Sequence, residues 1–246
     1  MRPHFTSEIR QTDTLSDELK QRMYGLFQTY YCDVTETLFL NDLREKNYIL
    51  LFWEKGAAEP LVGFSTLCVR EENARTVSIF SGDTVLHEKC WGSRILQKAF
   101  SVFIARTKFR YPTRSVYWML MSKGYKTYLL VRKNFPVSYP NYRTSAPTEV
   151  LALKNNFYRG KYGAAFDPTT SIIRFSEAHG AVKDDIAIPS EESVQGNPDI
   201  GFFVRSNPGY QIGDEFACIA EIRLWDIAYT SLKYVTASIA RKKNKK

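Results

Sequence analysis

Between residues 75 and 134 the spacing of apolar residues switches from the period of a strand to that of a helix and back, and this alternation constrains the fold most. Residues 75–80 are rich in β-branched and aromatic side chains, 91–107 repeat apolar residues at helical spacing, and 115–121 are again strand-like. A strand, a crossover helix and a following strand pair in parallel. The sequence therefore predicts a parallel strand pair.

Two earlier strands, 48–53 and 61–69, lead into 75–80 through short polar turns, which is typical of an antiparallel meander. Three further helices are expected, at residues 15–31, 36–46 and 124–134. Thr14 and Asp17 resemble a capping box at the start of the first helix. We expect a mixed α/β (α+β) fold in which helices flank a central mixed sheet.

The chain beyond the Pro-rich segment 136–147 has a less regular pattern. Its expected elements are a helix from Thr148, strands at 171–175 and 215–222, a polar loop at 176–198 and a final helix from about Arg223. We divide the chain into a core, 1–147, an α/β extension packed on it, 148–240, and a basic tail, 241–246, which we expect to be disordered.

Several classes of protein are disfavoured by what the sequence lacks. The longest unbroken apolar stretch, Ile49 to Trp53, is far shorter than the roughly 20 residues that span a bilayer, and no signal-peptide core follows Met1. The four cysteines form no CxxC pair, and neither a P-loop nor a Gly-x-Ser-x-Gly elbow occurs. We expect a soluble, cytoplasmic protein without a membrane span, disulfide scaffold or metal site.

Charge is distributed unevenly within the formal total of +8. Between Glu88 and Glu149 there are twelve Lys or Arg residues and no Asp or Glu. A positive field of this size attracts nucleic acid, a phosphorylated co-substrate or an acidic carrier protein, although a solvated basic face would have the same composition.

The order of the predicted elements resembles that of the GNAT superfamily of N-acyltransferases. In that family a Gln/Arg-x-x-Gly-x-Gly/Ala loop between the fourth strand and the next helix binds phosphate. The matching stretch here is His87-Glu88-Lys89-Cys90-Trp91-Gly92, in which Gly92 agrees while His87 and Cys90 depart from the motif. The resemblance implies that coenzyme A, or the phosphopantetheine of an acyl carrier protein, is the co-substrate. The expected binding residues are His87, Lys89, Cys90, Trp91, Gly92, Ser93 and Arg94.

Physical chemistry supports this loop independently, because the first turn of a helix has unpaired N–H groups and a partial positive charge that suit a pyrophosphate. The structural alternative is that Gly92 is a turn residue and Trp91 a core anchor. Other stretches resemble a GNAT-like bacterial group associated with biosynthetic clusters, some of which acylate amines of small molecules or peptides. These stretches include 81–84, 117–128, Phe135 with Tyr139-Pro140, Phe202-Phe203, 207–209 and 213–215.

Such an enzyme holds an acyl thioester beside its fourth strand while a neutral amine attacks, and a base accepts the proton. Asp83, just after the strand that ends at Phe80, is the expected base; a turn carboxylate is the alternative. The family's usual acid is a Tyr, but the matching position is Leu130, so Tyr128 or Tyr125 is expected to replace it.

The leading hypothesis is an N-acyltransferase that moves an acyl group from acyl-CoA or an acyl carrier protein to a primary amine, such as a Lys- or ornithine-like side chain, of a small molecule or peptide. The first alternative is a GNAT-fold protein that binds an acyl thioester without transfer. A nucleic-acid-binding module ranks last, since no RNP or helix-turn-helix signature is present.

Overall fold

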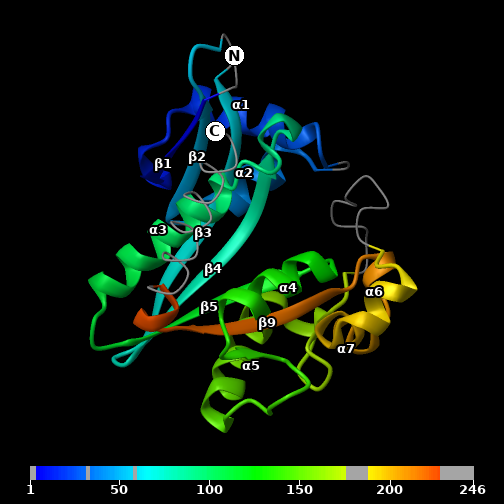
Figure 1. The fold of residues 1–246 in the computed structure, drawn as a ribbon. Coiled ribbons are helices and arrows are strands. Elements are labelled where there is room, and N and C mark those ends of the chain that lie inside the picture. The colour runs from blue at the N-terminus through cyan, green and yellow to red at the C-terminus, as the bar shows by residue number, and fades with distance from the viewer. Residues whose placement is uncertain (1–3, 32–33, 58–59, 176–187, 228–246) are drawn as a thin grey trace, which may run out of the picture.

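One twisted, mixed sheet organises the chain in a computed structural model that describes residues 4–31, 34–57, 60–175 and 188–227 (Figure 1). Nine strands form the sheet in the order β1-β2-β3-β4-β5-β9-β8-β7, and β6 pairs with β9. The strands are β1 (Phe5–Gln11), β2 (Tyr48–Glu54), β3 (Leu61–Asn73), β4 (Thr76–Leu86), β5 (Ser115–Ser122), β6 (Ser138–Tyr139), β7 (Phe166–Asp167), β8 (Ile172–Ile173) and β9 (Glu215–Ile222). The expected mixed α/β fold is confirmed.

The predicted meander and parallel pair are both present. β2, β3 and β4 pair antiparallel, and β4 pairs parallel with β5 from Thr76 to Phe80. β1 was not predicted, because only Phe5 and Ile9 of this seven-residue edge strand are apolar. The sheet continues across residue 147, since β9 of the expected extension pairs along β5.

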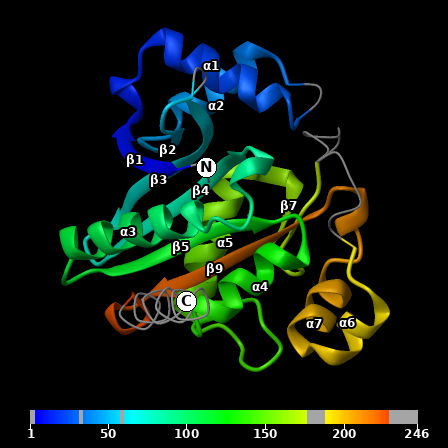
Figure 2. The ribbon, with the colours of Figure 1, turned by 45° about the horizontal axis from the view of Figure 1, so that its top comes forward.

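Helices cover both faces of the sheet (Figures 1 and 2). The larger helices are α1 (Asp17–Gln28), α2 (Glu36–Arg44), α3 (Ile95–Arg110), α4 (Tyr125–Asn134) and α5 (Thr148–Tyr162). Along each strand alternate residues enter different buried clusters: Leu50 packs on the side of α3 and α4, whereas Ile49 packs on the side of α1 and α2. α5 covers the latter side of β5 and β9. The result is a three-layer arrangement.

Two details of the helix predictions are wrong. Ser16, not Thr14, caps α1 by accepting a hydrogen bond from the Leu19 N–H at 3.2 Å, because Thr14 belongs to a preceding 3₁₀ turn. The expected polar loop, 176–198, contains a helix, α6 (Glu191–Gly196), capped by Ser190, and a second helix, α7 (Pro198–Ser206), capped by Asn197, begins at the last residue of that loop. Residues 176–187 of that loop lie outside the described residues.

At the C-terminal end, Asp226 and Ile227 donate backbone hydrogen bonds to the Arg223 carbonyl, at the start of the expected final helix. The remainder of that helix and the tail, 241–246, lie outside the described residues. None of the described helices is long and apolar enough to cross a membrane.

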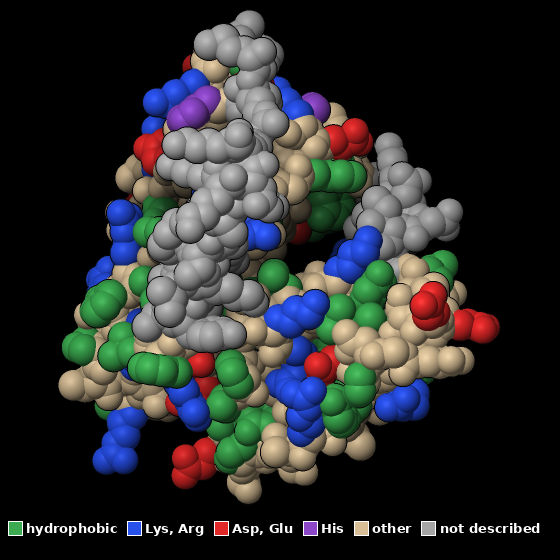
Figure 3. Space-filling view, in the orientation of Figure 1, with side chains coloured by type: hydrophobic (Ala, Val, Ile, Leu, Met, Phe, Trp, Pro, Cys, Tyr) green, Lys and Arg blue, Asp and Glu red, His purple; other side chains and the backbone are tan. Residues whose placement is uncertain are grey.

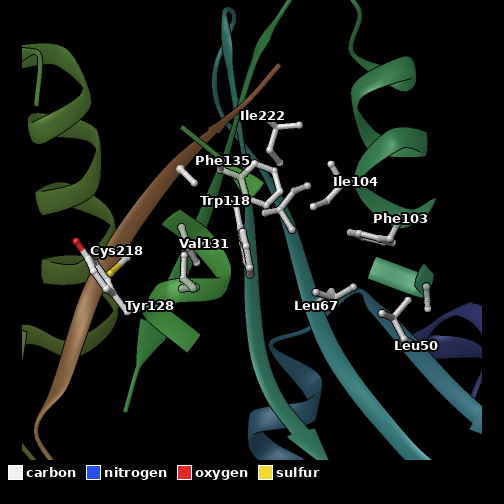
Figure 4. Close-up of a cluster of buried hydrophobic side chains, with 14 of the residues drawn as sticks. Leu50, Leu67, Phe103, Ile104, Trp118, Tyr128, Val131, Phe135, Cys218 and Ile222 are labelled. Atoms are coloured by element: carbon white, nitrogen blue, oxygen red, sulfur yellow. The ribbon is translucent and has the colours of Figure 1, made fainter. Parts of the chain in front are cut away.

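Trp118 of β5 occupies the centre of the core between the sheet, α3 and α4 (Figure 4). Its ring lies 4.6 Å from that of Phe100 and 5.4 Å from that of Phe135, measured between centroids. The indole N–H donates to the Ser81 hydroxyl at 3.0 Å, so Trp118 ties β5 to β4 at the level where these strands separate.

Candidate functional site

The two parallel strands β4 and β5 separate halfway along their length. Their pairing ends at Phe80 and Met119, after which β4 continues to Leu86 beside β3 and β5 continues to Ser122 beside β9. Beyond this point β4 remains paired with β3 and β5 remains paired with β9, but β4 and β5 are no longer paired with each other. The separation opens a gap in the middle of the sheet.

A β-bulge in β4 lies at this gap. The β3–β4 register shifts between Ser65, opposite Thr84, and Leu67, opposite Ser81, so Gly82 and Asp83 together face Thr66. A bulge of this kind bends the strand and redirects side chains. Gly82 is required there, because a Cβ would lie 2.6 Å from Thr66 Oγ1 and 2.7 Å from Lys46 Cε. The bulge thus brings Asp83 to the gap.

A cavity of about 500 Å³ passes through the gap and reaches both faces of the sheet. On the α3 and α4 side its wall is mainly apolar, with amide and hydroxyl groups of Gln97, Ser101 and Asn134 among the apolar residues. The apolar residues of that wall are Leu96, Phe100, Ile104, Trp118, Leu120, Leu130 and Phe135. A hollow flanked by Lys and Arg side chains is visible between the two halves of the molecule (Figure 3).

On the opposite side the cavity wall is charged. Its acidic and basic residues are Asp42, Asp83, Glu215, Lys46, Lys123 and Lys161, and they are joined there by Tyr31 and Tyr162. Lys46 Nζ lies 2.7 Å from Asp42 Oδ1, and Lys123 Nζ lies 3.2 Å from Glu215 Oε1. The cavity therefore has an apolar end and an end with charges of both signs.

Asp83 is the carboxyl group with the clearest sign of a functional environment. Burial, reinforced by the negative charge of Asp42, raises its pKa from 3.8 to about 6, although Lys46 and Lys123 act in the opposite direction. Burial and the nearby Asp83 charge also raise the pKa of Tyr31. A carboxylate with a pKa near 6 is ionised at neutral pH and is a stronger base than an ordinary Asp.

The expected phosphate loop does join β4 to α3. It makes a tight turn, with φ of +76° at Gly92 and +60° at Arg94, and Ser93 Oγ accepts from the Ile95 N–H at the start of α3. Cys90 is buried in the core, Lys89 pairs with Glu54, and His87 accepts from the Lys89 N–H. None of the seven expected residues lines the cavity. The first residue after the loop that does so is Leu96, in the first turn of α3.

Trp91 is 58% exposed and is therefore not a core anchor, whereas Gly92, with its positive φ, does lie in a turn. Its indole N–H donates to the Leu86 carbonyl at 3.1 Å.

The two tyrosines expected to act as acid lie outside the cavity wall. Tyr128 is buried beside Cys218 (Figure 4), and its hydroxyl donates to the Pro140 carbonyl at 3.0 Å. Tyr125 packs partly buried against the core. Leu130, at the position of the family's tyrosine, does line the cavity, but its side chain has no proton to donate.

Sequence reasoning missed most of the charged wall. Tyr31, Lys46, Lys161 and Glu215 come from four separate regions of the chain, and no local motif marks any of them. Sequence also overstated the basic block, because acids from elsewhere pair with it: Glu71 with Arg114, Glu215 with Lys123, and Asp199 with Arg132. The described residues contain no cluster of His, Cys, Asp and Glu suited to a metal ion.

No family model and no curated protein matches the sequence. Among solved structures, an acyl-CoA N-acyltransferase from Pseudomonas aeruginosa is 16% identical with a TM-score of 0.42, and the match covers 57% of this chain and 94% of that one. Glucosamine-6-phosphate N-acetyltransferase from Arabidopsis thaliana is 15% identical with a TM-score of 0.39, covering 58% and 99%.

A GNAT family N-acetyltransferase, YhbS, from Escherichia coli in complex with CoA is 13% identical with a TM-score of 0.38, covering 55% and 71%. At these identities and TM-scores the similarities establish neither a family nor an activity for this chain.

Proposed function

We propose that the protein is a GNAT-like N-acyltransferase that moves an acyl group from a thioester, either acyl-CoA or an acyl carrier protein, to a primary amine of a small molecule or peptide. The observation that carries the proposal is the cavity through the β4–β5 gap, with Asp83 at the gap between an apolar wall and a charged wall. An acyl thioester fits the apolar side, and an amine fits the charged side.

The donor enters between α3 and α4 in this proposal. Its acyl chain and pantetheine arm would lie against Phe100, Trp118 and Leu120, with Gln97 and Asn134 available to the pantetheine amides. The β4 backbone beyond Phe80 is not paired to β5, so its polar groups can meet the pantetheine as a neighbouring strand would. The diphosphate would lie at the loop from His87 to Arg94, where the α3 dipole is positive.

The amine approaches from the charged wall as a neutral nucleophile. Its nitrogen attacks the thioester carbonyl, Asp83 accepts the amine proton, and the C–S bond breaks to release a thiolate. Asp83 is ionised above its pKa of about 6 and can accept a proton at neutral pH. The thiolate is a stable enough leaving group near neutral pH for a dedicated acid to be dispensable, in keeping with the leucine at position 130.

A thioester-binding protein without transferase activity is the second candidate, and the absence of an acidic side chain at Leu130 favours it. The two are separated by incubating the protein with a panel of acyl-CoA donors and amine or peptide acceptors and weighing the products by mass spectrometry. Donor binding without any product would support the second candidate. If the protein binds no donor and forms no product, both candidates are refuted.

A further inference from the structure

The charged wall of the cavity contains three lysines, and they differ in how firmly their acidic partners hold them. We propose that the acceptor amine carries a carboxylate and that Lys161 binds this carboxylate while Asp83 faces the amine. This inference rests on the proposed function, since it assigns the acceptor class of the same cavity. It favours a free amino acid or similar small carboxylated amine over an internal lysine of a peptide, whose carboxylate is consumed in an amide bond.

Lys46 is buried and held in place by hydrogen bonds within the protein. Its side chain is 1% exposed, and its ammonium donates to Asp42 Oδ1 at 2.7 Å and to the Asp42 carbonyl at 3.0 Å. Its stem also fills the space where Gly82 lacks a Cβ. Moving this ammonium toward a ligand would break two hydrogen bonds inside the protein, so Lys46 serves as a fixed positive charge.

Lys123 is also held in place. Its partner, the Glu215 carboxylate, is 4% exposed, and the ammonium of Lys123 lies 3.2 Å away. If Lys123 turned to a ligand, Glu215 would remain as a buried charge with this partner lost, which is costly. Lys123 and Glu215 therefore act together as a neutral pair.

Lys161, near the end of α5, can change partners. Its ammonium lies 2.7 Å from Glu45 Oε2, but the Glu45 side chain is 62% exposed and water can solvate it as soon as the lysine leaves. Exposed ion pairs of this kind contribute little to stability. A carboxylate entering the cavity can thus replace Glu45 at small cost.

Two aromatic rings of the cavity wall lie beside the Lys161 ammonium. It lies 5.2 Å from the centroid of Phe80 and 5.6 Å from that of Tyr162, and both rings line the cavity. Phe80 is three residues before Asp83 on β4, at the last paired position before the gap. A molecule lying across Phe80 would therefore meet a cation at one end and the base at the other.

The balance of charge in the wall agrees with a zwitterionic ligand. Asp42, Asp83 and Glu215 oppose Lys46, Lys123 and Lys161, so the wall favours neither a purely cationic diamine nor a purely anionic acid. A ligand with both charges pairs with both kinds of group.

Matched ligand pairs test the inference. We would titrate the protein by calorimetry at low salt with L-lysine against cadaverine, L-ornithine against putrescine, and β-alanine against ethylamine, each pair differing by one carboxylate. At least one carboxylated member should bind tenfold or more tightly than its partner. Lys161→Met should weaken binding of the carboxylated member and thereby remove this preference. Arg159→Met, which removes a positive charge from the exposed side of the same helix, should retain the preference.

The inference is overturned if no pair shows a preference for the carboxylate, or if Lys161→Met weakens both members equally. Acyl transfer to the same amines is measured separately. Transfer to bare amines without carboxylate preference would leave the proposed function intact and reject the inference alone. If no acyl transfer occurs but the protein still prefers the carboxylated amines through Lys161, the proposed function is rejected and the carboxylate site at Lys161 is retained.

Discussion

Replacing Asp83 by Asn should make the protein more stable and much less active. The pKa of Asp83 rises from 3.8 to about 6 on folding, chiefly through burial, so the folded state disfavours the ionised form. One pKa unit corresponds to about 1.4 kcal/mol, and the ionised carboxylate therefore destabilises the fold by up to about 3 kcal/mol above pH 6. Asn carries no charge and avoids this cost.

The stability gained by Asp83→Asn should depend on pH. Because the folded state binds the Asp83 proton more tightly than the unfolded state, the cost is absent below pH 3.8, grows as pH rises through the interval to about 6, and is constant above it. Urea unfolding should show the stability difference between Asp83→Asn and the unsubstituted protein growing as pH rises from 3.8 to about 6. Asp13→Asn, at an exposed position of the first 3₁₀ turn, should change the stability by less than about 0.5 kcal/mol.

Activity should follow the same group. The unsubstituted protein should lose kcat/KM as pH falls below about 6, and Asp83→Asn should lower kcat/KM by about 10²-fold or more and remove that limb, as expected when a general base is lost. Acyl transfer over a pH series, with donor binding by calorimetry, checks both. A stability difference that does not vary with pH, or full activity in Asp83→Asn, would refute the assignment.

Three further predictions concern the loop, the buried tyrosine and the tail. Gly92→Val should abolish coenzyme A binding in calorimetry, whereas Gly56→Val, which imposes the same strain at φ +79° in an equally open turn, should retain it; equal losses in both would contradict a phosphate loop at Gly92. Tyr128→Phe should cost about 1 kcal/mol of stability through its lost hydrogen bond to Pro140 and lower kcat less than Asp83→Asn does, and a loss of equal size would restore Tyr128 as the acid. Deleting residues 241–246 should remove most of a weak, salt-sensitive binding to single-stranded DNA measured by fluorescence anisotropy, and tight binding without the tail would favour a nucleic-acid function.

Most of the core elements could be predicted because each carries its own periodic pattern. The strand at 48–53, the helix at 91–107 and the strand at 115–121 all correspond to observed elements, with ends displaced by a few residues. β1 and α6 were missed, since an edge strand with charged residues and a short helix within a polar region lack a strong pattern.

The candidate site was less predictable. Asp83 could be found because it lies between the strand-like segment that ends at Phe80 and a Gly-containing loop. It does line the cavity, but β4 continues through it to Leu86 and does not end before it. The sequence could not show that the Tyr128 hydroxyl donates to the backbone carbonyl of Pro140 and does not line the cavity. Lys161 and Glu215 could not be found, since they reach the site through α5 and β9.

The sequence by itself determined which segments are strands and helices and that β4 and β5 run parallel, because local periodicity and the handedness of crossover connections are properties of the chain. The tertiary structure alone decided where those strands separate. That point depends on the bulge opposite Thr66, on β9 inserting beside β5, and on Lys46 filling the space at Gly82. These contacts join residues far apart in the chain, and so the cavity, its two walls and the raised pKa of Asp83 are properties of packing.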